Sequence, residues 1–385
     1  MKVLYVAKGL NSFVYKFLSP YLKEMHNRGW MVGVAARDDR PDMSYNHGDI
    51  DNQIEYHNII FGSKRLQIPN FCAVFQLIEL IKKNHYQIVH CHTAVAAAVT
   101  RLAAGMMGKD KPIIIYTTHG FHFCRGASFL RWLLYFPIEY YLSKYTDVLI
   151  TINQEDYRIA KKFKTKELRF LPGVGIDLSR FYPDQRIRNR LRGQLGVEND
   201  VFVLVSVCEL IPRKNVIAVI RALSEMKRRG QLGKFQYWIC GSGPQEKWLK
   251  KQVKKKDLTK FVQFLGQRED VQNIDRAADA FILLSRQEGL PVAVMEAMAS
   301  GLPVICSNVR GCRDLIQSGE NGLLIGSDRV ERVIQAIQQL QFSDGLRRRL
   351  SDASLKSIQQ YDEKKTVSDV LDIYNSVAQK GERFV

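Results

Sequence analysis

Two glutamates and a proline lie close together in the segment Arg286–Glu296, which reads RQEGLPVAVME. Pro291 suits the first position of a helix, where its missing amide hydrogen costs nothing. The backbone amides that follow, beginning at Val292, would then be free to bind an anion. Glu288 lies before this helix and Glu296 about one and a half turns into it, so both carboxylates can accept hydrogen bonds from the hydroxyl groups of one ligand. The pattern predicts a ligand that combines sugars with phosphate.

A basic pair ends a second segment, Cys208–Asn215 (CELIPRKN), which follows an apolar run at 201–207. Arg213 and Lys214 come directly before an expected helix, for which Asn215 is a suitable N-cap. Cations in this position would bind a diphosphate together with the helix N-terminus. A basic pair in a loop is more often simply solvated, so this pair alone is weak support for a phosphate site.

A glycine-rich turn, Gly241–Pro244 (GSGP), follows the apolar run at 235–240. Glycine here lets the backbone approach a ligand closely. Such turns are common after strands, however, the spacing G-x-G-x-x-G is incomplete, and no Walker lysine follows. By itself the turn does not identify a ligand.

Several residues could suggest a metal. Four of the eight histidines, with two cysteines nearby, gather at two expected strand ends, but they lack a recognised ligand spacing. We therefore favour histidines that hydrogen-bond a ligand or the core. Asp49-x-Asp51 lies in a polar loop, and ordinary turn chemistry explains it. We predict neither a metal nor another cofactor. The histidines and cysteines considered are His90, Cys91, His92, His119, His122 and Cys124.

The elements that would position these residues can be read from apolar runs. Continuous apolar strands that alternate with helices indicate parallel sheets covered on both faces. Two groups of about six strands predict an α/β fold with two doubly wound, Rossmann-like domains. Ligands bind at the carboxyl ends of such strands, so two domains facing each other would form one cleft. The expected strands are 2–7, 31–36, 87–92, 113–118, 147–152 and 168–171, then 201–207, 235–240, 262–265, 279–285, 302–306 and 322–325; helices include 14–28, 73–84, 215–229 and 291–300.

The domain boundary is expected between Pro172 and Val201, because the PGVG sequence at 172–175 interrupts the first half and 186–192 is charged without strand character. We assign residues 1–175 to the first domain, 176–360 to the second and 361–385 to a C-terminal helix.

Composition excludes several classes of protein. Of 385 residues, 46% are apolar and 25% charged, which excludes a wholly disordered chain. No apolar run reaches the ~18 residues of a membrane span, and the N-terminus reads as a strand rather than a signal peptide. Seven scattered cysteines without a Cys-x-x-Cys pair favour a reducing compartment over a disulfide framework.

The net charge of +18 predicts an anionic partner: nucleic acid, an anionic membrane or a phosphorylated substrate. Residues 1–172 contain 23 basic against 14 acidic residues, and the remainder 34 against 25. Each part therefore has a net charge of +9, which places the charge on folded surfaces rather than on a tail.

Taken in order, these segments resemble the retaining family 4 glycosyltransferases of GT-B fold, and within them the capsular and exopolysaccharide branch. The resemblance covers nearly the whole chain. It rests on the segments already quoted and on THGFHF at 118–123, DVLITIN at 147–153, PGVGID at 172–177 and RGCRDLI at 310–316.

The resemblance implies transfer of a sugar from a nucleotide-sugar, expected to be UDP-linked, with retained anomeric configuration. Residues 1–175 would form the acceptor side, 176–360 would bind the donor, and the helix at 361–385 would cross back to the first domain. The acceptor would be a polyprenyl-diphosphate-linked saccharide, which implies a cytoplasmic protein, peripheral at the inner face of the membrane.

The resemblance also assigns roles to residues. Three of them, His119, Glu288 and Lys214, would act in catalysis: the first two beside the donor sugar and the third at the diphosphate. The wider donor site would comprise Gly9, Arg213, Lys214, Gly241, Gly266, Arg268, Glu288, Gly289, Leu290, Pro291, Val292 and Glu296, with Glu296 on the ribose and Gly266–Arg268 against the base.

Two positions depart from the family pattern. Glu209 stands where many members have arginine, so we expect it to point away from the diphosphate or to contact Arg213. The first loop, Lys8–Ser12, has one glycine, Gly9, instead of a pair, which leaves its phosphate or acceptor role open.

Two other functions remain open from the sequence: a nucleotide-sugar epimerase of GT-B-like fold, and a nucleic-acid-binding protein. The even distribution of charge over both parts of the chain and the absence of a nucleic-acid motif argue against the second.

An anionic membrane is the other partner expected. Aromatic residues from Phe121 to Tyr141 would insert shallowly, although an ordinary core helix would look similar. Candidate cations are Lys64, Arg65, Lys82, Lys83, Arg125, Arg131, Lys161 and Lys162.

Overall fold

The structure is a computed structural model and describes residues 1–39, 54–62, 68–327 and 329–382. The chain divides into two compact units, Met1–Gly175 with Glu363–Val385 (unit 1) and Ile176–Asp362 (unit 2). Each unit is built on one parallel sheet, so the predicted α/β fold with two doubly wound domains is confirmed.

Unit 1 contains a seven-stranded sheet in the order β3-β2-β1-β4-β5-β6-β7. Its central strands are buried and largely apolar because helices cover both faces. The strands are β1 (Lys2–Gly9), β2 (Met31–Arg37), β3 (Glu55–Asn58), β4 (Ile88–His92), β5 (Ile113–Thr118), β6 (Val148–Thr151) and β7 (Glu167–Phe170).

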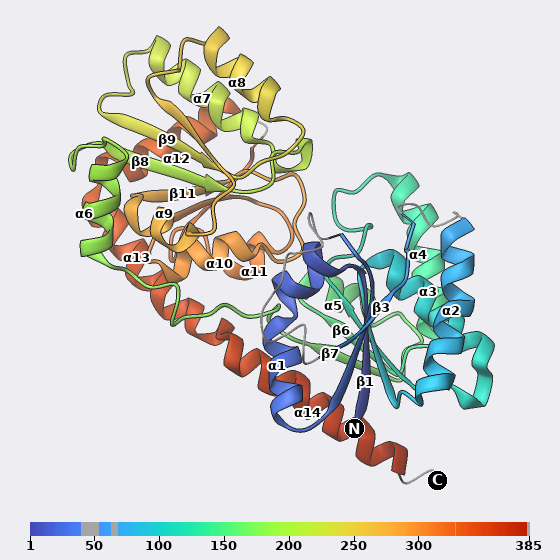
Figure 1. Cartoon of the computed structure of the whole chain (residues 1–385). Coiled ribbons are helices and arrows are strands. Elements are labelled where there is room, and N and C mark those ends of the chain that lie inside the picture. The colour runs from blue at the N-terminus through green and yellow to red at the C-terminus, as the bar shows by residue number, and fades with distance from the viewer. Residues whose placement is uncertain (40–53, 63–67, 328, 383–385) are drawn as a thin grey trace. The chain divides into compact units, whose positions relative to one another are not determined.

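The helices of unit 1 form two layers (Figure 1). One layer contains α2 (Ile68–Asn84), α3 (Ala94–Met107), α4 (Phe129–Ser143) and α5 (Gln154–Ala160). The other contains the π-helix η1 (Leu10–Tyr15), α1 (Ser19–Asn27) and the last helix, α14 (Glu363–Glu382), which packs beside α1. A short 3-10 helix, η3 (Gly108–Asp110), follows α3. The chain therefore returns to the first sheet at its C-terminal end.

Strand β3 was not predicted. Its sequence, EYHN, is polar, and its residues are exposed or half-buried at the edge of the sheet. An edge strand that buries neither face needs no apolar pattern, so hydrophobic periodicity cannot detect it.

Unit 2 contains a six-stranded sheet in the order β10-β9-β8-β11-β12-β13. The strands are β8 (Phe202–Val207), β9 (Phe235–Cys240), β10 (Val262–Gly266), β11 (Ala280–Leu283), β12 (Val304–Ser307) and β13 (Leu323–Ile325). Helices α7 (Val216–Arg228), α8 (Glu246–Lys255) and α12 (Val330–Phe342) pack on one face. Helices α9 (Val271–Ala277) and α10 (Val292–Ala299) lie on the other (Figure 1). The remaining helices are α6 (Gln185–Gln194), η4 (Pro212–Lys214), α11 (Cys312–Leu315), α13 (Asp344–Ile358) and η5 (Gln359–Tyr361).

The order of each sheet reverses once. The reversal lies between β1 and β4 in unit 1 and between β8 and β11 in unit 2. At such a switch point the loops that follow the two strands turn in opposite directions, which opens a ligand-sized crevice at the carboxyl edge. These two edges hold most of the predicted residues. None of the described helices is long and apolar enough to cross a membrane.

Candidate functional site

The switch point of unit 2 brings together the loops after β8 and β11. The amide of Arg286 donates to the carbonyl of Arg213 at 2.8 Å. Asn215 occupies the N-cap position of α7, as predicted, but in the left-handed conformation (φ 54°), and its side chain does not cap the helix. The amide Nδ2 instead donates to the carbonyl of Leu284 at 3.2 Å. Asn215 therefore joins the two loops by a hydrogen bond instead of capping the helix with its side chain.

Glu288 is the centre of this site. Its side chain is only 7% exposed, and its carboxylate oxygens lie 2.6 Å from Lys214 Nζ and 3.2 Å from Arg213 Nη1. Arg213 Nη1 also donates to the carbonyl of Gln287 at 2.9 Å. The buried Arg310, whose position the sequence did not assign to the site, donates through Nε to the carbonyl of Glu288 at 3.1 Å. Two cations on one carboxylate leave an excess of positive charge, which suits a diphosphate.

A tight contact fixes the loop that carries Glu288. Gly311, in the left-handed region at φ +76°, lies so close to the loop that a Cβ atom there would be 2.1 Å from the carbonyl oxygen of Gly289. Pro291 was predicted at the first position of the helix, but it occupies the N-cap of α10 in extended conformation. The helix begins one residue later, at Val292. Leu290 is buried beneath this turn. The first amides of α10 have no preceding turn to bond to and can serve a ligand.

Glu296 lies half-buried on α10, as expected from its spacing after Glu288. The sequence did not reveal its neighbour Asp275 on α9, which is fully buried. Burial, and then the charge of Glu296, raise the pKa of Asp275 well above its ordinary value. The sequence feature that could have identified Asp275 is its position on the apolar face of a short helix, next to Ile274.

The loops after β9 and β10 lie beside the loop after β8. Gly241 donates its amide to the carbonyl of Gly266 at 2.7 Å. At φ +131°, a Cβ on Gly241 would lie 2.0 Å from the carbonyl oxygen of Cys208, so only glycine fits. Arg268 forms an ion pair with Asp270 at 2.7 Å. Glu209 is exposed.

In unit 1, three of the four histidines meet at the carboxyl edge of the sheet. His92 Nδ1 lies 3.1 Å from His119 Nε2, and the rings of His90 and His92 are 4.2 Å apart. Burial lowers the pKa of His119 to about 4 and that of His90 to about 3, so these rings are neutral at pH 7. His122 is exposed instead, with its ring 4.8 Å from Tyr135.

The first loop binds a carboxylate of its own chain. Gly9 precedes η1, and the amides of Asn11 and Ser12 donate to Asp39, the former at 2.6 Å. Within the described ranges, no group of three or more histidine, cysteine or acidic side chains could hold a metal ion. Asp49 and Asp51 lie outside those ranges.

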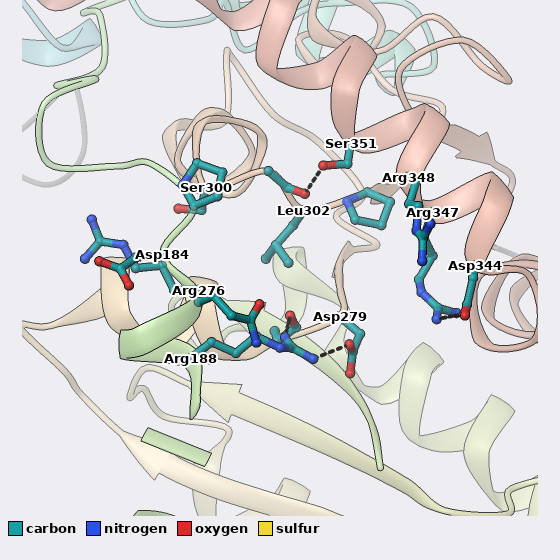
Figure 2. Close-up of a pocket in the computed structure, with 15 residues that line it drawn as sticks. Asp184, Arg188, Arg276, Asp279, Ser300, Leu302, Asp344, Arg347, Arg348 and Ser351 are labelled. Carbon is teal, nitrogen blue, oxygen red and sulfur yellow. Dashed lines mark hydrogen bonds and ion pairs between the residues drawn. The ribbon is translucent and has the colours of Figure 1, made fainter. Parts of the chain in front are cut away.

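A hollow of about 690 Å³ lies elsewhere in unit 2, at the amino ends of β11 and β12 (Figure 2). Several arginines line it, but they hold the fold together. Arg188 pairs with Asp279 at 2.6 Å, and Arg347 donates to the carbonyl of Gln341 at 3.0 Å. This hollow is at the edge of the sheet opposite Glu288 and does not belong to the candidate site.

Comparisons with known proteins agree with this architecture. Residues 187–357 match the family of glycosyl transferases group 1, and residues 2–153 match the glycosyl transferase 4-like family. The chain is 35% identical over 363 residues to EpsD of Bacillus subtilis (strain 168), which is named as a glycosyltransferase; the match covers 94% of this chain and 93% of EpsD. It is 29% identical over 311 residues, 80% of each chain, to an Escherichia coli protein named UDP-Gal:alpha-D-GlcNAc-diphosphoundecaprenol alpha-1,3-galactosyltransferase.

Two solved structures have a similar fold. Anabaena HepE in complex with UDP-glucose superposes with a TM-score of 0.78 at 19% identity, covering 98% of this chain and all of HepE. Sucrose-phosphate synthase from Thermosynechococcus elongatus gives 0.79 at 18% identity, covering 99% of this chain and 100% of that one.

Proposed function

We propose a specific sugar transfer for this chain, which belongs to the group 1 glycosyltransferases and has the GT-B fold. A hexose or N-acetylhexosamine would pass from a UDP-linked donor to a polyprenyl-diphosphate-linked saccharide, with retained configuration. The reaction would serve capsular or exopolysaccharide assembly. The Escherichia coli relative supports both classes of substrate, because its name contains UDP-Gal and a diphosphoundecaprenol acceptor. HepE supports a UDP-linked donor through its complex with UDP-glucose. The observation that carries the proposal is the cationic cluster around Glu288 at the switch point of unit 2.

The proposed chemistry is electrostatic. Breaking the bond between the anomeric carbon and the phosphate oxygen places negative charge on the departing UDP. Lys214 and Arg213, already held by Glu288, would stabilise that charge together with the first amides of α10. The departing phosphate oxygen would take the proton of the acceptor hydroxyl, so no separate base is needed.

The hydroxyl groups of the donor have their own partners in this proposal. Glu296 would accept hydrogen bonds from the ribose, and Glu288 would lie beside the donor sugar, with Gly289 and Leu290 offering backbone amides. His119 would bind the same sugar. Arg268 and the backbone at Gly241 and Gly266 would border the base.

Donor binding is tested first by thermal shift with UDP-glucose, UDP-galactose, UDP-N-acetylglucosamine, UDP-N-acetylgalactosamine and GDP-mannose. A ligand at a hundred times its dissociation constant stabilises the folded state by about 2.7 kcal/mol, so a specific donor raises the melting temperature by several degrees. Stabilisation by GDP-mannose alone would overturn the UDP assignment.

Transfer is then measured with the donor so identified and polyprenyl-diphosphate N-acetylglucosamine, and the new anomeric configuration is read by NMR. We expect a product with the configuration of the donor. Inversion, or conversion of the donor into an epimer without acceptor, would contradict the proposal, and so would salt-sensitive DNA binding without any transfer.

We also propose that unit 1 docks on the inner face of the membrane. Helices of a parallel sheet begin at the edge where its strands end, so the first turns of α2 and α4 share an edge with His119. The outer surface there is apolar and uncovered, which is typical of interfacial helices. Its exposed residues are Phe71 and Phe75 on α2 and Phe129, Leu130, Leu133, Leu134, Ile138 and Tyr141 on α4.

Cations border this apolar surface. Arg125 and Arg131 are exposed near the start of α4, and each well-placed cation contributes about 1 kcal/mol of attraction to an anionic leaflet. Lys82 and Lys83 are exposed too, but they lie in the last turn of α2, away from its first turn. The expected cations Lys161 and Lys162 are exposed as well, whereas Lys64 and Arg65 lie outside the described residues.

Vesicle pelleting tests this proposal. The protein should sediment with phosphatidylglycerol vesicles at low salt and dissociate as salt screens the charges. Changing Arg125 and Arg131 to Glu should reduce pelleting without altering binding of the soluble donor. The matched control changes Lys254 and Lys255 of α8 to Glu, which removes the same charge from unit 2. If the wild type does not sediment with anionic vesicles, or if both double variants lose vesicle binding equally, the assignment of the membrane-binding site to this surface is wrong.

A further inference from the structure

A chain of buried rings runs beneath His119 in unit 1. His119 Nε2 lies 3.1 Å from His92 Nδ1, and the ring of His92 packs against His90 at 4.2 Å. His92 also stacks on Tyr5 at 5.6 Å, with an angle of 7° between the rings. His92 is only 3% exposed. Its ring therefore has little freedom to turn.

The proton positions of His90 follow from its partners. Tyr374 on α14 donates its hydroxyl proton to Tyr5 at 2.8 Å. The oxygen of Tyr374 must then accept from His90 Nδ1, which lies 2.5 Å away. Since the neutral ring carries one proton, His90 Nε2 accepts from Thr117 Oγ1 at 2.7 Å. Two hydrogen bonds thus lock the ring on which His92 packs.

The proton position of His92 follows from an unfilled partner. Among the residues that the structure describes, His92 Nε2 has no hydrogen-bond partner, although it is buried. A buried N–H group without a partner is rarer than a buried lone pair without one. We therefore place the lone pair on Nε2 and the proton on Nδ1, from which it points to His119.

We propose that His92 is a positioning residue: by donating from Nδ1 to His119 Nε2, it fixes the ring of His119 and keeps the proton of His119 on Nδ1 as a donor for the sugar. The inference rests on the proposed function, in which His119 binds the donor sugar. Tyr374 and His90 extend the same support, which connects α14 to the site.

The tautomer is tested without any activity measurement. Long-range proton–nitrogen NMR spectra of the full chain labelled with ¹⁵N-histidine distinguish the two neutral forms, and each signal is assigned by single substitution. We expect the Nδ1–H form for His90, His92 and His119, in contrast to the Nε2–H form that neutral histidine prefers in water. An Nε2–H form of His119 in the wild type would overturn the inference.

Variants of His92 test the consequence for transfer. His92→Leu removes the donor, whereas His92→Asn places an amide near the Nδ1 position and should restore it. We expect His92→Leu to lower kcat about ten- to a hundredfold with little change in the Michaelis constant for the donor, because a misplaced group loses mainly transition-state contacts. His92→Asn should recover most of that loss. The exposed His122→Leu is the control and should leave kcat unchanged.

These outcomes separate the inference from the proposed function. If His92→Leu shifts the tautomer of His119 but His119→Ala transfers sugar normally, the positioning is right and the role of His119 is wrong. If the folded His92→Leu variant keeps both the wild-type tautomer and the wild-type kcat, His92 does not position His119. Should His92→Leu fail to fold, an equal kcat loss in His92→Asn and in His92→Gln, whose amide cannot reach the Nδ1 position, refutes the specific contact.

Discussion

Replacing Lys214 by Met should lower the rate of sugar transfer about thirtyfold. Lys214 Nζ is 2.6 Å from Glu288, and its side chain is 15% exposed. Two unit charges 4 Å apart in an environment of effective dielectric constant 20 interact by about 4 kcal/mol. If roughly half a negative charge has moved to the diphosphate in the transition state, Lys214 contributes about 2 kcal/mol, which corresponds to the thirtyfold effect. The ion pair with Glu288 is present before and during the reaction and largely cancels.

The assay is single-turnover release of UDP from the donor identified by thermal shift, with saturating acceptor. Lys214→Arg should retain most of the rate, because a guanidinium also reaches the diphosphate and keeps the charge. Arg213→Met should cost less than Lys214→Met, since Arg213 is 43% exposed and solvent screens its charge. Lys227→Met removes a cation from the other end of α7 and is the matched control. A Lys214→Met variant with near-normal turnover would show that the leaving group is stabilised elsewhere.

Four further predictions follow from the same geometry. Glu296→Ala should weaken donor binding by about 1.5 to 3 kcal/mol, because the ribose loses a charged acceptor; unchanged affinity by calorimetry would contradict that role. Full transfer activity is expected after treatment with EDTA, because cationic side chains neutralise the diphosphate; loss on chelation and recovery with one divalent ion would refute this mechanism. Glu139→Ala should lower the free energy of unfolding of unit 1 by about 3 to 5 kcal/mol, because Arg101, 2.8 Å away and 1% exposed, would be left buried without its counter-charge; urea titration measures this, and the double variant Arg101→Met, Glu139→Leu should recover stability. Finally, burial lowers the pKa of His90 to about 3, so the unfolded state binds the proton more readily below pH 6.5. Stability should fall by about 1.4 kcal/mol per pH unit for this histidine as the pH drops from about 6.5 towards 3, and His90→Gln should flatten that dependence in acid unfolding curves.

The sequence predicted the parts of this protein whose causes are local. Buried parallel strands are largely apolar, so β1, β4, β5 and β8 were visible as apolar runs. Ligand-binding loops follow such strands, so the segments after β8 and β11 could be recognised before the sheet order was known. The polar edge strand β3 is not buried, so it has no apolar pattern and could not be predicted from the sequence.

Contacts between residues far apart in the chain could not be predicted from the sequence. His90 meets Tyr374 across 284 positions, and Arg101 pairs with Glu139 across 38. In both cases a buried polar group needs a partner, but the sequence does not say which of many polar residues supplies it. The histidines at the end of β4 could be grouped from their spacing, whereas the tyrosine that orients them could not.

The pairing of Arg213 shows which physical term decides such contacts. From the sequence, Glu209 was one candidate partner because it is four residues away and of opposite charge. The guanidinium instead contacts Glu288, 75 residues away, at 3.2 Å. Glu209 is exposed, so water solvates its carboxylate and an ion pair would add little. Glu288 is almost completely buried, and a buried carboxylate without cations would cost several kcal/mol. Burial of the acid rather than distance along the chain therefore selects the pair. Because burial depends on how the sheet places the loop after β11, the cluster at the diphosphate site is a consequence of the fold that no local pattern contains.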